Sequence, residues 1–204
     1  MAPKPKSLVR TLARRGPHRV LRGDLAFAGM PGVVCTPEAG LGLPAVVFGH
    51  GWLTSPERYI ETFAHLASWG IVVAAPATAR GPVPSARGFA EDLSTTADIC
   101  TGVRLGRGGI SVHPDKVALG GHGFGAGAAV LAAAGHIAAE SDGGGHTGGG
   151  STADSGTTAA LARRAKDPKV RHPIAAVAAL YPAVTTPPAP PATTTNSLVS
   201  IRAS

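Results

Sequence analysis

The sequence predicts an α/β fold in which a mostly parallel sheet carries helices on both faces. Three observations predict it. Short apolar runs alternate with longer amphipathic segments, the runs are apolar throughout, and a glycine-rich turn joins one run to the next helix. Continuously apolar strands are typical of sheets covered on both sides. Alternation of strands with helices is typical of parallel crossover connections.

The chain up to residue 76 is predicted to hold four strands and one helix. Pro56 begins the helix, apolar residues recur at helical spacing as far as Trp69, and Gly70 ends it. The last two strands flank this helix and form a βαβ unit with it. In chain order the strands are Val20–Phe27, Val33–Thr36, Leu43–Gly49 and Ile71–Ala75.

Beyond residue 76 the pattern continues and is then interrupted by low-complexity sequence. Helices are expected at Phe89–Leu105 and Ala126–Ala139, and strands at Lys116–Leu119, Ile174–Leu180 and Ser197–Ile201. We divide the chain into a basic N-terminal arm at 1–22, a core at 23–140, a Gly/Ser/Thr-rich linker or insertion at 141–168, and the remaining core strands with a Pro/Thr-rich tail at 169–204.

The net positive charge of the chain is confined to the arm. The sequence has 19 Lys and Arg against 12 Asp and Glu. Seven of these bases and no acid lie in Met1–Arg22, so residues 23–204 are formally neutral. The arm is expected to be solvated or to lie on an anionic surface. We expect no specific nucleic-acid binding, because no recognised nucleic-acid module or interleaved aromatic residues accompany the bases.

Several other classes of protein are excluded. The sequence lacks a transmembrane run of about 18 apolar residues, and the arm lacks the apolar stretch of a signal peptide. Cys35 and Cys100 have no metal-ligand spacing, so a reducing, cytoplasmic location is expected. No cofactor and no metal site are expected; His136 and His146, which flank a glycine tract, are only a weak metal signal.

The segment Lys116–Gly127 (KVALGGHGFGAG) carries the most chemical information. It reads as a strand, a tight turn and a helix, the setting of the G-x-S-x-G nucleophile elbow. Aligned to that pattern, Gly121 and Gly125 are the flanking glycines and Gly123 occupies the position of the nucleophile. Glycine adopts the strained turn at little cost, but it has no side chain that attacks a carbonyl.

From about Val20 to Gly135 the chain resembles an α/β-hydrolase of the dienelactone-hydrolase and polyester-hydrolase type. The resemblance rests on Val46–Trp52 (VVFGHGW), the helix and strand that follow, and the glycine-rich turn, in that order. It implies a carboxylic-ester hydrolase fold with oxyanion donors at the backbone N–H groups of Trp52 and Phe124. Two such preorganised donors stabilise the negative charge of a tetrahedral intermediate.

Three residues beside these donors are further candidates for the oxyanion hole or for substrate binding: His50, Gly51 and His122. His50 is expected to hold its turn by hydrogen bonds. His122 precedes the elbow residue on the same strand, so we expect it to pack beside the sheet rather than to act in catalysis.

Five other polar residues are expected to have no specific functional role. They are Ser55, Ser85 and Ser111 on surface loops, and Asp92 and Asp98 on the solvated side of a helix.

The resemblance also implies what the sequence lacks. The family carries its acid after the strand that follows Ile174–Leu180, and its histidine further on. The sequence ends at Ser204 without this region, so we expect a C-terminally truncated α/β-hydrolase fold. The expected function is that of a protein related to serine ester hydrolases but inactive, with a small ester or carboxylate as its ligand.

Two alternatives remain open at this point. One is an active ester or lactone hydrolase with a non-standard site. The other is a dinucleotide- or phosphate-binding module, because Gly121–Ala126 matches the pattern G-x-G-x-x-A between a strand and a helix. That pattern expects an acid at the end of the next strand, about 20 residues on. Here Glu140 and Asp142 fall at a helix end and in a glycine tract.

Overall fold

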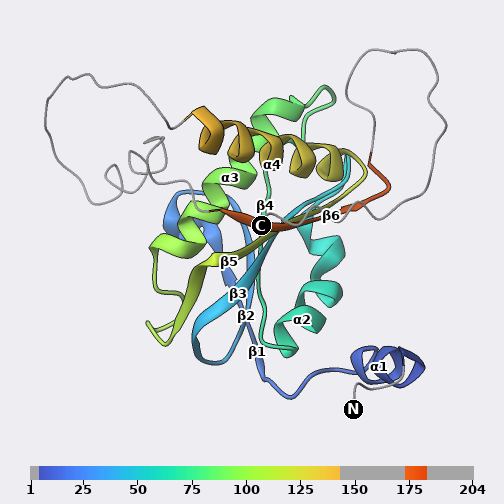
Figure 1. Ribbon diagram of the computed structural model, residues 1–204, viewed down its shortest axis with the longest axis vertical. Helices are drawn as coiled ribbons and strands as arrows, with labels where there is room; N and C mark the ends of the chain where they lie inside the picture. Colours follow the sequence, from blue (N-terminus) through green and yellow to red (C-terminus); the bar gives the residue numbers. More distant parts are fainter. Residues whose placement is uncertain (1–4, 143–172, 183–204) are drawn as a thin grey trace, which may run out of the picture.

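The computed structural model describes residues 5–142 and 173–182, and it shows a six-stranded sheet with helices on both faces (Figure 1). The strand order is β1-β2-β4-β3-β5-β6. Strands β3 to β6 are parallel, whereas β1 and β2 are antiparallel to their neighbours. The strands are β1 Val20–Asp24, β2 Gly32–Pro37, β3 Gly40–Gly49, β4 Val72–Pro76, β5 Ile110–His122 and β6 Ile174–Leu180. The predicted α/β architecture is confirmed.

The helices divide between the two faces of the sheet. Figure 1 shows α3 and α4 on one face and α2 on the other, while α1 stands apart from both layers. The bounds are α1 Pro5–Leu12, α2 Ile60–Ser68, α3 Ala86–Gly102 and α4 Phe124–Asp142, with short 3₁₀ helices at Leu25–Ala28 (η1) and Pro56–Tyr59 (η2). Among the described residues, no helix has the length and apolar character needed to cross a membrane. The expected strand Ser197–Ile201, most of the expected linker and His146 lie outside the described residues.

Alternate residues of the central strands reach two separate cores. On β4, Val72 packs in the cluster that contains Leu93 of α3, while Val73 packs in the cluster that contains Phe63 of α2. All four side chains are fully buried, and burial of each contributes roughly 1.5–3 kcal/mol. A strand covered on both faces needs apolar residues at every position, which is the pattern that the sequence shows.

Two elements have boundaries other than those expected, because polar side chains cap them. The strand expected to reach Phe27 ends at Asp24, whose carboxylate accepts a hydrogen bond from Ala26 N (2.8 Å) and starts η1. Helix α3 begins before Phe89, because the Ser85 hydroxyl accepts from Gly88 N (3.1 Å) and caps the helix. Ser85 was expected to be a surface serine without a specific role, but it is the N-cap of α3.

Strand β5 is much longer than the expected Lys116–Leu119. It begins at Ile110 and pairs there with Gly40, where β3 also begins earlier than expected. The Ser111 hydroxyl accepts from Gly42 N (2.9 Å), which ties the two extensions together and gives this serine a structural role. The register shifts between Gly40 and Ala45, and an irregular ladder of this kind tolerates a proline such as Pro114.

Candidate functional site

The candidate site lies where β5 turns into α4. Gly123 forms the turn with φ of 56°, in the left-handed region that favours glycine. Its carbonyl accepts from Ala126 N (3.1 Å), and its N–H donates to the carbonyl of Leu180 at the end of β6 (2.9 Å). Helix α4 begins at Phe124, directly after this residue and two residues earlier than expected. The turn therefore has the strand–turn–helix form that a nucleophile elbow requires.

The glycines of the turn have different physical roles. Among the described residues, a Cβ added to Gly123 would meet no other heavy atom within 4 Å. A Cβ on Gly125 would strike the backbone carbonyl of Gly49, and one on Gly121 would strike the backbone of Gly125. The first turn of α4 thus crosses the ends of β3 and β5 at backbone contact. The flanking glycines are required by close packing, whereas Gly123 is required only by its backbone conformation.

The loop after β3 provides the second side of the site. It forms a tight turn in which the backbone N–H and the hydroxyl of Thr54 both donate to the carbonyl of Gly51 (3.2 and 2.6 Å). Trp52 occupies this turn, and its backbone N–H has no acceptor among residues 5–142 and 173–182. Phe124 N–H, at the first position of α4, has no acceptor within the helix. Both predicted oxyanion donors therefore lack a backbone acceptor among the residues that the structure describes.

The buried side chain of His50 fixes this loop. Its side chain is fully buried, with Nε2 2.7 Å from the carbonyl of Thr78 and Nδ1 2.9 Å from the carbonyl of Gly51. Carbonyl oxygens only accept, so the shorter contact places an N–H on Nε2. The ring also packs on Phe89 of α3, with centroids 4.9 Å apart. His50 therefore holds the end of β3 to the loop after β4, as its predicted role requires.

His122 is held on the α2 side of the sheet. Gly51 N–H donates to the hydroxyl oxygen of Tyr59 (3.2 Å), and the same hydroxyl lies 3.0 Å from His122 Nδ1, at hydrogen-bond distance. The hydroxyl of Tyr59 therefore joins the turn after β3 to His122. Tyr59 was not among the predicted site residues. The signal available was an aromatic residue in the first turn of the helix that follows the HGW turn.

Exposed apolar side chains surround the turn. Trp52 and Leu53 are 55% and 65% exposed, and Leu180 and Tyr181 at the end of β6 are 45% and 76% exposed. The ring of Tyr181 also meets the edge of the His122 ring, with centroids 6.3 Å apart. Large apolar side chains exposed beside convergent polar groups are typical of small-molecule sites.

A second group of polar residues, between α3 and α4, has a packing role. His136 is buried, and its Nε2 lies 3.2 Å from the hydroxyl of Ser94. That hydroxyl donates to the carbonyl of Ala90 (3.1 Å), so the histidine must donate to the serine. A nucleophilic serine must instead donate its hydroxyl proton to the histidine. Asp98, expected on the solvated side of α3, has a buried carboxylate oxygen instead.

Comparison with known families gives one match. The family model of the chlorophyllases matches residues 24–142, from the end of β1 to the end of α4. This range is more than half of the chain and contains the glycine turn and the two residues predicted to supply oxyanion donors. No curated protein matches the chain. The sheet and the family agree on the architecture, and the chain belongs to the chlorophyllase family of α/β-hydrolase-type esterases.

Proposed function

We propose that this chain binds a carboxylic ester, lactone or carboxylate at the turn around Gly123 without hydrolysing it. The observation that carries the proposal is Gly123 itself, which stands in a complete strand–turn–helix elbow and has no side chain. Ester hydrolysis by this family of folds begins with attack of a serine oxygen or cysteine sulfur on the carbonyl carbon. Without that atom no covalent acyl intermediate forms.

Two backbone N–H groups support the proposal. The N–H groups of Trp52 and Phe124 have no acceptor among the described residues, as shown above. Helix α4 also directs the positive end of its dipole at the turn. Within residues 5–142 and 173–182, no heavy atom lies within 4 Å of the position that a Cβ on Gly123 would take. A carbonyl or carboxylate oxygen that binds the two donors would therefore meet no steric obstacle at Gly123.

The surroundings favour a ligand with an apolar part. The exposed side chains of Trp52, Leu53 and Tyr181 would cover an acyl or alcohol group while the carbonyl oxygen binds the donors. Short esters, lactones and carboxylates of the kind taken by dienelactone-type and polyester-type hydrolases have this shape. We propose them as the ligand class.

Binding is tested by calorimetry with butyrate and with ethyl butyrate. Gly123→Asp would place a negative charge in the open space, and we expect butyrate binding to weaken by more than tenfold. Gly102→Asp is the matched control, because a Cβ there also meets nothing within 4 Å and the residue lies at the end of α3. No heat above buffer with wild type, or equal loss in both variants, would contradict the proposal.

Hydrolysis is tested with p-nitrophenyl acetate and butyrate. We expect wild type to release no p-nitrophenol above the buffer rate. Turnover by wild type that persists in His122→Gln would favour the alternative of an active hydrolase with a non-standard site. A gain of turnover in Gly123→Ser would show that the nucleophile alone is missing. Enhanced NADH fluorescence on mixing with wild type would favour a dinucleotide at the same helix N-terminus.

A further inference from the structure

Helix α1 is amphipathic, and none of its residues is buried. Leu8, Val9 and Leu12 share one side of the helix, and 45%, 67% and 45% of their respective surfaces are exposed. Lys6 and Arg10 lie one turn apart on another side, and Arg14 continues their row just after the helix. These three cations line a common groove with Ser7 and Thr11. None of the α1 residues is buried, so folding of the described residues does not account for the apolar side.

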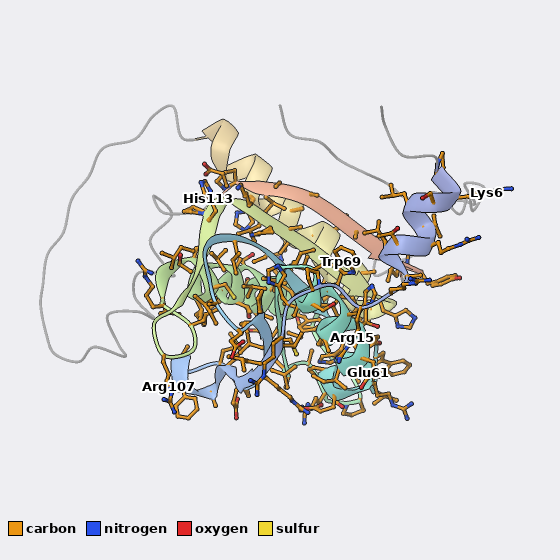
Figure 2. All side chains as sticks on the ribbon, turned by 90° about the horizontal axis from the view of Figure 1, so that it is seen from below. Lys6, Arg15, Glu61, Trp69, Arg107 and His113 are labelled. Carbon is orange, nitrogen blue, oxygen red and sulfur yellow. The ribbon has the colours of Figure 1, made fainter. Side chains whose placement is uncertain are left out.

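In the part of the chain that the structure describes, hydrogen bonds join α1 to the body at its last residue and through the segment that follows it. His65 Nε2 donates to the carbonyl of Leu12 (2.8 Å), and the indole N–H of Trp69 donates to the carbonyl of Arg14 (3.1 Å). Gly16 N–H then donates to the hydroxyl of Ser68 (2.8 Å). These contacts fix the carboxyl end of α1 at the end of α2 and leave its side chains free. Figure 2 shows Lys6 pointing away from the rest of the molecule.

We propose that α1 docks the protein on an anionic lipid bilayer, with Leu8, Val9 and Leu12 entering the interface and the cations binding lipid phosphates. Short amphipathic helices with basic residues beside an apolar side bind membranes in this way. Charge complementarity identifies the occupant, since the arm contains seven bases and no acid. Nucleic acid would satisfy the cations but would leave the three apolar side chains in water.

The strength of docking follows from the number of basic residues. A basic residue near an anionic membrane surface contributes about fivefold in binding constant. Replacement of Lys6, Arg10 and Arg14 by glutamine should therefore weaken binding by about 100-fold at low salt. Replacement of Leu8 and Leu12 by serine should weaken it by at least about tenfold, because less apolar area enters the interface.

The test is sedimentation of the full chain with vesicles of phosphatidylcholine, alone or with about 30% phosphatidylserine. The basic variant is Lys6→Gln/Arg10→Gln/Arg14→Gln, and the apolar variant is Leu8→Ser/Leu12→Ser. The matched control is Arg87→Gln/Arg104→Gln/Arg107→Gln, which removes the same charge from exposed positions on α3 and after it. Figure 2 places Arg107 on the opposite side of the molecule from Lys6. Thermal melts should coincide for all variants, because none of the replaced residues is buried.

If α1 docks the protein on an anionic membrane, the sedimentation experiment should give the following pattern of binding. Wild type and the control should bind the phosphatidylserine vesicles at low salt, release them at about 500 mM salt and ignore pure phosphatidylcholine. Both α1 variants should lose binding. Equal loss in the control, or no wild-type binding at low salt, would overturn the proposal. Tighter binding to duplex DNA that is unchanged in the apolar variant would overturn it in favour of nucleic acid.

Discussion

A methyl group added at Gly123 should cost far less stability than one added two residues later. The left-handed conformation at φ of 56° costs a residue with a Cβ roughly 1–2 kcal/mol. Loss of glycine's freedom in the unfolded chain offsets about 0.4–1 kcal/mol of this. Because a Cβ there meets nothing within 4 Å, no packing cost is added. Gly123→Ala should therefore lower the free energy of unfolding by about 1 kcal/mol.

Gly125→Ala should behave differently. Its Cβ would overlap the backbone carbonyl of Gly49, which no change of side-chain rotamer relieves. Helix α4 or β3 must then move, and we expect a loss of about 3 kcal/mol or more. Gly135→Ala, in an open part of α4, is the matched control and should raise stability by about 0.5–1 kcal/mol.

Urea unfolding of the three variants and wild type measures these differences. In thermal melts, each kcal/mol corresponds to about 2–4 °C for a chain of this size. If Gly123→Ala is as destabilising as Gly125→Ala, the space in front of Gly123 is not open. The reasoning that gives this position room for a ligand would then be refuted.

Three further predictions concern local interactions. Tyr59→Phe leaves the buried N–H of Gly51 without its acceptor and should cost about 1–2 kcal/mol in urea unfolding. Burial raises the pKa of Cys100 from 9.0 to about 12, so the folded chain holds this proton after the unfolded chain has released it. Stability should therefore fall between about pH 9 and pH 12, and this fall should be smaller in Cys100→Ala. Asp24→Ala removes the cap on Ala26 N and should cost about 1 kcal/mol in thermal melts.

The sequence was most informative for strands that form continuously apolar runs. The run Ile174–Leu180 forms β6 with the expected bounds, and Leu43–Gly49 lies within β3. Both runs lack charged residues. The first ends at Gly49, and Tyr181 follows the second. In β3 the apolar run reflects burial on both faces, with Ala45, Val47 and Phe48 buried. In β6, by contrast, Val177 is the one buried residue among those that the structure describes. The turn at Gly123 was also predictable, because its glycines follow a strand and precede a helix.

Other elements depended on tertiary contacts. Gly40 and Ile110 extend their strands only because each provides the other's partner across 70 residues, and their local sequence is typical of loops. The roles of Tyr59 and Asp98 depend on which residues the fold brings beside them. Ser85 was different: a serine directly before a helix is a recognised cap signal that the sequence itself contains.

The anchor of the N-terminal arm and the turn at Gly123 lie at opposite ends of the parallel strands. Helix α2, which holds the arm, ends at Ser68 just before β4 begins, whereas Gly123 follows the end of β5. Because β3 runs parallel to both strands, these two points are separated by the length of the strands. A surface that holds the arm would leave the turn facing the aqueous phase. Its ligand would then arrive by diffusion through water, and its association rate would not depend on the lipid composition.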